Sequence, residues 1–466
     1  MARNPIYLGP RLKSLRRELG LTQANMAADL EISPSYIALI ERNQRPVTAE
    51  LLLRLASTYR IDMAELAKDD SPDVAARLQA VLKDPVFADI DLPALDIADI
   101  ATSYPGFAEA LLRLHMAHRE EQMTLAERLA NGGGLSTPPP ADPAVQARAF
   151  LAARRNYFAA LDESASQASR AANSIAALEE RIGNAHGLEV RYADQSLLIG
   201  AVRWHDYHRR RIVLSDRLDH AGRRFQLALQ LAILEQDEAI AAELEQGRFE
   251  SEDARNLARR ALQSYWAAAL LMPYDAFVRA AADLKYDVEL LAARFQVSFE
   301  QAAHRLTTLQ RPGNQGVPFF FLRVDRAGNV SKRLDGAGFP FARHGGGCPL
   351  WNIYKAFSSV GQVDAQLIQL PDGQRFVSIA RTVQAGGSGY GAPSALRAVA
   401  LTCAAEHLGR LVYARELAGR EPMLIGTSCP TCHRPRCLAR SAPPIGRELL
   451  PNRYRDTGVP FAFSGE

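Results

Sequence analysis

The tract Gly132–Pro140 reads Gly-Gly-Gly-Leu-Ser-Thr-Pro-Pro-Pro, and it most limits how this chain can fold. Successive glycines are flexible, whereas successive prolines are extended and lack an amide hydrogen, so neither a helix nor a central strand can continue through the tract. The 466 residues also exceed the about 100–200 residues of one ordinary domain. We therefore predict a multidomain protein with a linker here.

Composition and charge exclude several classes of protein. Hydrophobic residues make up 47% and charged residues 23%, with 55 basic and 52 acidic side chains, as is typical of a soluble globular protein. No apolar stretch approaches the ~20 residues that a membrane-spanning helix needs. Met1–Gly20 lacks the apolar segment of a secretory signal. We therefore expect a cytoplasmic protein that does not span a membrane.

The pattern of apolar residues changes near residue 310. Before it, the spacing is mainly that of helices, and after it aromatic and β-branched runs such as Val317–Val324 predict strands. Gln366–Val383 predicts a hairpin, and Ala395–Leu408 is expected to be helical. The predicted fold class is a mainly α N-terminal half followed by a C-terminal α+β domain. The expected segments are 1–70, 71–140, 141–310 and 311–466.

Residues 12–42 predict a helix-turn-helix. Gly20 ends one helix, Thr22 can cap the second, and Ser33 followed by proline begins a third after a tight turn. A plain helical bundle would have the same spacing, but the residues also resemble the XRE/Cro-repressor helix-turn-helix over about 8–66. One such unit reads only a few base pairs, so a homodimer on double-stranded DNA is expected. The candidate DNA-binding residues are Arg11, Thr22, Gln23, Ser33, Ser35, Tyr36, Arg42, Asn43, Gln44 and Arg45.

Two apolar helical segments within 225–273 resemble the IrrE-like zinc-peptidase module. That module would carry His-Glu-x-x-His, in which two histidines hold zinc and the glutamate acts as general base. The corresponding positions here hold Leu229, Gln230 and Ile233, and the third ligand position holds Leu262. None of these side chains can bind zinc or abstract a proton. We therefore expect no catalytic residues, and a packing role for this segment.

Four of the five cysteines form a candidate metal site: Cys348, Cys429, Cys432 and Cys437. The last three have the spacing C-x2-C-x4-C, which lets thiolates converge on one centre, and neighbouring arginines would stabilise the thiolates. Cys348 follows three glycines that allow close approach, and His433 is an alternative fourth ligand. Cys403 is expected to be a buried core thiol. Zinc, an iron–sulfur cluster and a purely structural knuckle all stay open.

The whole arrangement, ending in the tail Cys429–Pro444, resembles the short-chain fatty acyl transcriptional regulators of bacteria. Ser441 is the one departure from the tail motif of that family. The resemblance implies a sequence-specific DNA-binding regulator of short-chain fatty acyl metabolism, not an enzyme, whose effector is a short-chain acyl-CoA such as propionyl-CoA. It also implies a [4Fe-4S] cluster in the tail domain of some members, with zinc as the alternative here.

A coenzyme A site needs cations for its phosphates and an apolar wall for the acyl group. The glycine loop 386–391 after a strand is a possible cradle, although a plain mobile loop fits the same residues. The candidate ligand-binding residues are Trp351, Arg381, Tyr390 and Arg397. Two other functions fit the same motifs, namely a redox or iron–sulfur-sensing transcription factor and a regulator that retains hydrolase activity.

Overall fold

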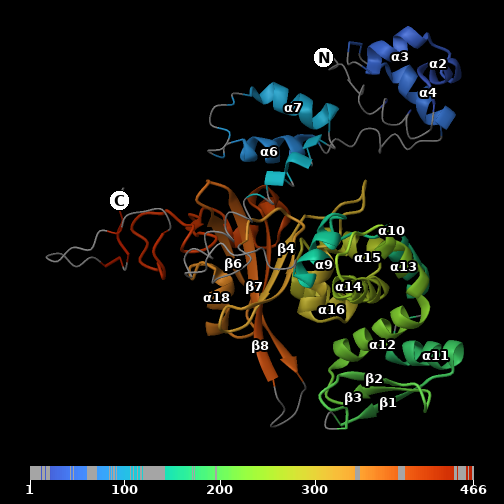
Figure 1. The fold of residues 1–466 in the computed structure, drawn as a ribbon, viewed down its shortest axis with the longest axis vertical. Helices are drawn as coiled ribbons and strands as arrows, with labels where there is room; N and C mark the ends of the chain where they lie inside the picture. Colours follow the sequence, from blue (N-terminus) through green and yellow to red (C-terminus); the bar gives the residue numbers. More distant parts are fainter. Residues whose placement is uncertain are drawn as a thin grey trace. The chain divides into compact units, whose positions relative to one another are not determined.

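The computed structural model divides the chain into two compact units, 1–122 and 123–466 (Figure 1). The described residues lie mainly in 21–41, 47–59, 71–82, 92–104, 142–170, 174–194, 197–341, 347–386 and 394–444, with isolated residues between these ranges and near the C-terminus. Each unit has hydrophobic clusters of its own.

Within 21–59, the first unit has three short helices, α2 (Gln23–Asp29), α3 (Pro34–Glu41) and α4 (Ala49–Tyr59). Glu31 has a φ of +53°, the left-handed conformation that turns the chain sharply between α2 and α3. The apolar sides of the helices share one core, which contains Leu12, Met26, Leu30, Ile37, Ile40, Leu51 and Leu55. The predicted helix-turn-helix is confirmed.

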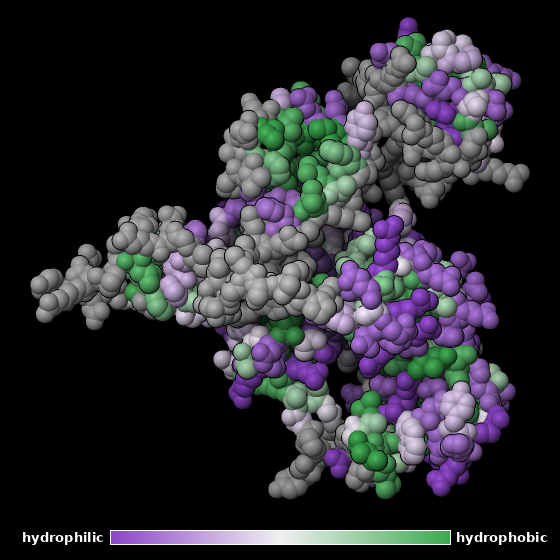
Figure 2. All heavy atoms as spheres, in the orientation of Figure 1, coloured by the Kyte–Doolittle hydropathy of each residue, from purple (hydrophilic) through white to green (hydrophobic). Residues whose placement is uncertain are grey.

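Two more helices, α6 (Ser71–Val81) and α7 (Ala94–Ser103), form a second small core in the same unit. Apolar side chains also gather on the surface over these helices (Figure 2). Leu95, Phe107 and Leu114 are 80%, 64% and 67% exposed. In the described part of the chain, no helix is long and apolar enough to cross a membrane.

The second unit begins with a helical module that ends near residue 307. Its helices are α9 (Pro143–Ala152), α10 (Ala159–Ser169), α11 (Ile175–His186), α12 (His220–Glu235), α13 (Asp237–Glu245), α14 (Glu252–Leu271), α15 (Tyr274–Asp283), α16 (Val288–Phe295) and α17 (Phe299–Leu306). A three-stranded sheet in the order β1-β3-β2 joins α11 to α12, with β1 (Glu189–Ala193), β2 (Arg203–Asp206) and β3 (Arg211–Ser215). Strand β1 is parallel to β3, and β2 is antiparallel to it.

The C-terminal part of the unit is built on a six-stranded sheet in the order β5-β4-β8-β7-β6-β9. Its elements are β4 (Phe320–Val324), β5 (Val330–Leu334), α18 (Asn352–Lys355), β6 (Asp364–Gln369), β7 (Arg375–Gly386), β8 (Ser394–Ala404), α19 (Ala414–Leu417) and β9 (Met423–Leu424). The hairpin predicted over Gln366–Val383 is present as β6 and β7. The fold class, a mainly α N-terminal half and a C-terminal α+β domain, is therefore confirmed.

The helix predicted over Ala395–Leu408 was wrong, because most of this segment is the strand β8 and a short 3-10 helix follows it. The residues from Ala398 to Cys403 are all buried. A strand covered on both faces has no polar alternation, so a run of small apolar residues does not distinguish it from a buried helix.

The two faces of the sheet belong to different cores. On the inner face, Val377 and Ile379 of β7 join the core of the helical module. On the outer face, Phe376 and Ala380 join a second core that includes Cys348 and α18. Because successive side chains of a strand point to opposite faces, strand parity assigns each residue of β7 and β8 to one core.

Candidate functional site

The exposed tip of the helix-turn-helix carries polar side chains at two helix starts. The Thr22 hydroxyl accepts a hydrogen bond from Asn25 N (3.1 Å), and the Ser33 hydroxyl accepts one from Tyr36 N (3.2 Å). The hydroxyl oxygens of Ser33 and Ser35 lie 3.0 Å apart on the exposed end of α3. These hydroxyls therefore stand where backbone N–H groups at helix starts can also meet phosphate.

A buried carboxylate of the helix-turn-helix was missed by sequence reasoning. Glu41 is only 8% exposed and bonds Arg16 Nε at 2.6 Å and Gln23 Nε2 at 2.7 Å. The hydrogen bond that Arg16 donates to Glu41 raises the pKa of Arg16. The Gln23 side chain, predicted to reach DNA, is thus held against Glu41. The only signal was an acid at the end of an otherwise apolar helix.

The other residues predicted to contact DNA differ in their exposure to solvent. Gln44 and Arg45 are exposed, whereas Tyr36 is half-buried against the core of the helix-turn-helix. Arg11, Arg42 and Asn43 lie outside the described residues.

The positions that match the zinc peptidase lie on α12 and α14, which pack against each other. Leu262 is fully buried, and Leu229 and Ile233 are half-buried on α12. Gln230 is 1% exposed, and its Nε2 has no hydrogen-bond partner among the described residues. At the position of the general base of the peptidase, this chain therefore has the neutral amide of Gln230, buried among the packed side chains of the module.

The four predicted cysteine ligands line one small cavity of about 20 Å³ on the outer-face side of the sheet. Backbone N–H groups of Gly426 and Leu350 donate to Cys348, while burial, the larger effect, raises the pKa of this thiol. A Cβ added to Gly426 would lie 2.7 Å from Cys432 Sγ, so only glycine lets the two segments approach. Cys403 pairs with Val377 on the inner face, fully buried and away from the cavity.

The chemistry of the cavity fits a thiolate-bound metal ion or cluster. Its lining residues include the four cysteines, Arg434 and Arg440, but no carboxylate. Arg440 is 3% exposed, and its Nε–H has no partner among the described residues. Within the same residues, no three His, Cys, Asp or Glu side chains are already arranged to hold a metal ion. The four thiols thus line one cavity, but their sulfur atoms are not positioned to coordinate one metal ion.

The predicted ligand-binding residues do not converge on one place. Arg381 and Arg397 share the inner face, because Arg381 pairs with Val399 and Arg397 with Val383 on adjacent strands. Arg381 also bonds Glu289 (3.0 Å). Trp351 packs in the outer-face core and donates to Ser378 Oγ (2.7 Å), so the sheet separates it from both arginines. Tyr390 lies outside the described residues.

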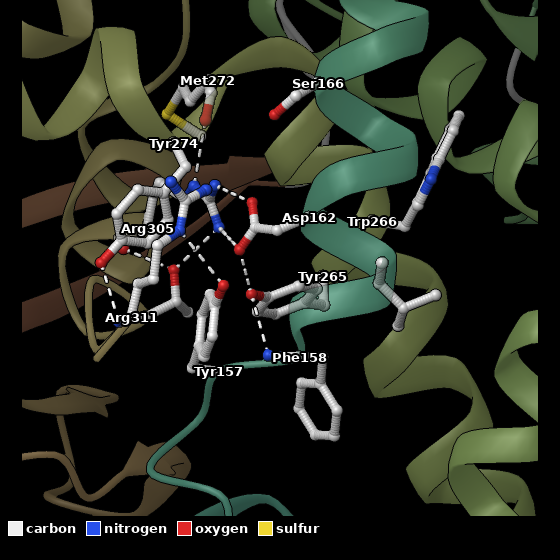
Figure 3. Close-up of polar contacts among 12 residues, drawn as sticks. Tyr157, Phe158, Asp162, Ser166, Tyr265, Trp266, Met272, Tyr274, Arg305 and Arg311 are labelled. Atoms are coloured by element: carbon white, nitrogen blue, oxygen red, sulfur yellow. Dashed lines mark hydrogen bonds and ion pairs between the residues drawn. The ribbon is translucent and has the colours of Figure 1, made fainter. Parts of the chain in front are cut away.

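A fully buried ion pair lies inside the helical module (Figure 3). Arg305 Nη2 of α17 donates to Asp162 Oδ1 of α10 at 2.5 Å, and the Tyr265 hydroxyl donates to the same carboxylate. Arg305 Nε also donates to Met272 O (3.1 Å), and its Nη1 to Thr308 Oγ1 (3.0 Å). Burial alone would lower the pKa of Arg305, but Asp162 and Tyr265 raise it above its ordinary value.

This network adjoins the segment 153–158, which connects α9 to α10 and contacts the C-terminal sheet. We call this segment the strap. Arg155 and Asn156 both have positive φ, and Asn156 Nδ2 donates to Asp335 O (2.8 Å) beyond β5. The next residue, Tyr157, accepts a hydrogen bond from Arg311 Nε (3.2 Å) in the segment that connects α17 to β4. The helical module and the sheet are therefore tied together at the strap as well as through the chain.

Three protein-family profiles match successive parts of the chain: a helix-turn-helix over 12–66, an IrrE N-terminal-like domain over 183–307, and the C-terminal domain of short-chain fatty acyl coenzyme A regulators over 308–461. The chain is 36% identical over 471 residues to the HTH-type transcriptional regulator RamB of Mycobacterium tuberculosis, with 98% of both chains covered. It is 39% identical over 466 residues to the propionyl-CoA carboxylase regulator of Cereibacter sphaeroides, again with 98% of both covered.

A solved structure, a transcriptional regulator of Mycobacterium tuberculosis, has 35% sequence identity and a TM-score of 0.65, and the match covers 69% of this chain and 99% of that one. These relatives are named regulators, in keeping with the loss of the peptidase residues in α12. The chain belongs to the short-chain fatty acyl coenzyme A regulators, a family of helix-turn-helix, DNA-binding transcriptional regulators of acyl metabolism.

Proposed function

We propose that the protein binds an operator as a homodimer in the bacterial cytoplasm and responds to a short-chain acyl-CoA of the propionyl-CoA type. One observation carries this proposal: a single chain joins a helix-turn-helix to the C-terminal domain of acyl coenzyme A regulators. The relative named as a propionyl-CoA carboxylase regulator supports the short acyl chain.

The DNA-binding part of the proposal rests on the exposed tip of the helix-turn-helix. Ser33 and Ser35 would reach base edges or phosphates, and Gln44 and Arg45 would contact the backbone. Because one such unit reads only a few base pairs, tight binding needs two copies at half-sites one helical turn apart. The exposed apolar side chains of Leu95, Phe107 and Leu114 support self-association through the α6–α7 segment.

The proposed domains are 1–70, 71–140, 141–310 and 311–466. The effector part of the proposal places the acyl-CoA site in the last of these, 311–466. Arg381 and Arg397 on the inner face, with Tyr390 of the glycine loop, are the proposed partners of the coenzyme A phosphates and pantetheine. Acyl-CoA can regulate DNA binding only by having different affinities for two arrangements of the dimer.

The cysteine part of the proposal assigns Cys348, Cys429, Cys432 and Cys437 to a [4Fe-4S] cluster, with zinc as the alternative. Among the described residues, the Arg440 Nε–H has no partner and no carboxylate lines the cavity, and both observations favour an anionic thiolate centre. A bound cluster would supply redox chemistry, and bound zinc would supply only rigidity.

The test measures how the affinity of the protein for DNA changes when different coenzyme A thioesters are added. Full-length protein selects its binding sequence from a randomised DNA pool, and fluorescence anisotropy then follows affinity for that DNA with acetyl-, propionyl-, butyryl- and free coenzyme A. We expect a short acyl thioester to change affinity, and Arg397→Gln to weaken this response. Arg375→Gln, at the exposed start of β7, is the matched control. A response absent for every thioester contradicts the effector assignment.

A redox sensor is the second candidate, because four thiols line one cavity. It predicts that oxidation of anaerobically purified protein changes DNA affinity, whereas acyl thioesters do not. The same anisotropy assay, run before and after air exposure, separates the two functions.

A further inference from the structure

We propose that Arg440 and Ser441 are positioning residues that close the cysteine loop and tune the metal ion or cluster it holds. The first role, closing the loop, stands on contacts within the chain. The second role rests on the proposed function, because it concerns the centre bound by the four thiols.

The side chain of Arg440 binds main-chain carbonyl groups of the cysteine loop. Its Nη1 donates to Cys432 O (3.0 Å) and Cys429 O (3.4 Å), and its Nη2 donates to Arg434 O (2.7 Å). Three carbonyl groups of the loop that carries the cysteines are thus gathered by one planar guanidinium. A lysine has the same charge but cannot form this fork of hydrogen bonds.

The guanidinium is covered by the C-terminal segment. Phe463 is 2% exposed, and its ring centre lies 5.0 Å from Arg440 Cζ. Phe463 also forms an isolated antiparallel bridge with Leu449. Exclusion of water on this side strengthens the hydrogen bonds of Arg440. Its positive charge must then be stabilised by neighbouring protein groups instead of by water.

The Nε–H of Arg440 stays available for the bound centre. The Nε–H is buried without a partner among the described residues, and Arg440 lines the cavity together with the four thiols. A buried unsatisfied donor is unfavourable, and a thiolate or sulfide would satisfy it with charge assistance.

Ser441 contacts a ligand sulfur directly. Its backbone N–H and its hydroxyl lie 3.4 and 3.3 Å from Cys429 Sγ. Hydrogen bonds to sulfur stabilise the thiolate form and raise the reduction potential of iron–sulfur clusters.

The first experiment measures metal affinity in full-length, anaerobically reduced protein. Co²⁺ is titrated and followed by its thiolate charge-transfer and visible bands. Loss of outer hydrogen bonds usually costs about 10–100-fold in affinity, so we expect about 10-fold for Ser441→Ala and about 100-fold for Arg440→Gln. Arg440→Lys is expected to restore little. Ser428→Ala is the matched control, because Ser428 lines the same cavity but bonds Thr431 rather than sulfur.

The second experiment needs no metal. Metal-free protein is treated with iodoacetamide, and peptide mass spectrometry follows each cysteine. We expect Arg440→Gln to speed alkylation of Cys429, Cys432 and Cys437, whereas buried Cys403 stays unmodified and reports that the fold is intact.

Unchanged alkylation in Arg440→Gln would overturn the loop-closing role. Equal Co²⁺ affinities and spectra for Ser441→Ala and Ser428→Ala would overturn the tuning role. Failure of the wild-type protein to bind Co²⁺ would count against both the tuning role and the proposed metal site, while the alkylation result would still decide whether Arg440 closes the loop.

Discussion

Removal of the Asp162 carboxylate should strongly destabilise the helical module. In Asp162→Leu, the guanidinium of Arg305 would keep its charge at 0% exposure with no counter-charge. Breaking one partner of a buried ion pair typically costs about 3–5 kcal/mol. Asp162 also accepts the hydroxyl of Tyr265, so we expect a loss in the upper half of that range.

The reverse and double variants separate charge from packing. Arg305→Met alone leaves the buried Asp162 carboxylate without its counter-charge, and it also leaves Met272 O without the donor it has now, which by itself costs about 1–3 kcal/mol. The double variant Asp162→Leu/Arg305→Met should therefore be more stable than Asp162→Leu alone and should retain only that residual loss. Because each single variant leaves a buried charge unpaired and the double variant leaves none, the two losses are not additive, and we expect a coupling free energy of at least about 3 kcal/mol between the two sites.

Hydrogen exchange read by mass spectrometry measures the result locally. Peptides from α10 and α17 report the free energy of opening, and peptides from α2 to α4 of the other unit serve as an internal reference. Glu163→Gln, an exposed carboxylate next to Asp162, is the matched control and should change little. A loss below about 1 kcal/mol for Asp162→Leu, or strict additivity in the double variant, would refute the ion-pair reasoning.

Three further predictions concern separate parts of the chain. Arg45→Ala should weaken DNA binding for all sequences and reduce the slope of log affinity against log salt by about 1, measured by anisotropy across a salt series. Burial, with Lys332, Arg305 and Arg323 nearby, lowers the pKa of His304, so the unfolded chain binds the extra proton and stability falls as pH drops below about 6.5. His304→Gln should flatten this acid limb in thermal unfolding between neutral and mildly acidic pH. Gln230→Met removes a buried amide whose Nε2 has no partner among the described residues, and it should stabilise the module by about 1 kcal/mol in urea titration.

Each of these three has a contradicting result. An unchanged salt slope would remove Arg45 from the phosphate contacts, and an unchanged acid limb would show that His304 is not the group that titrates. A lower urea midpoint for Gln230→Met would mean that the amide has a partner in solution, such as water.

Local pattern predicted the helix-turn-helix and the β6–β7 hairpin because caps, turns and periodicity are written within a few residues. It failed at β8, where both faces are buried and the alternation that identifies a strand is lost. Donor counting suggested Cys348 as the partner of a loop some eighty residues later, and all four thiols line one cavity.

Partners far apart in sequence could not be predicted. Asp162 and Arg305 are separated by 143 residues, and nothing in the periodicity of either helix pairs them. Trp351 was expected to bound the acyl end of the ligand and Arg381 to flank the glycine loop, but residue parity along β7 and the packing of α18 assign them to opposite faces of the sheet. Such pairings depend on the tertiary arrangement rather than on local propensity.

The strap at Arg155 and Asn156 has a mechanical consequence. A body joined by one connection can swivel about it in any direction, whereas a second connection leaves only rotation about the line through both, and a shared core opposes that rotation as well. The helical module and the sheet are joined by the chain near residue 310 and again by Asn156 on Asp335 O, and they share one core. Any force that an effector applies to the sheet is therefore passed to the helical module through this hydrogen bond and this shared core as well as through the chain.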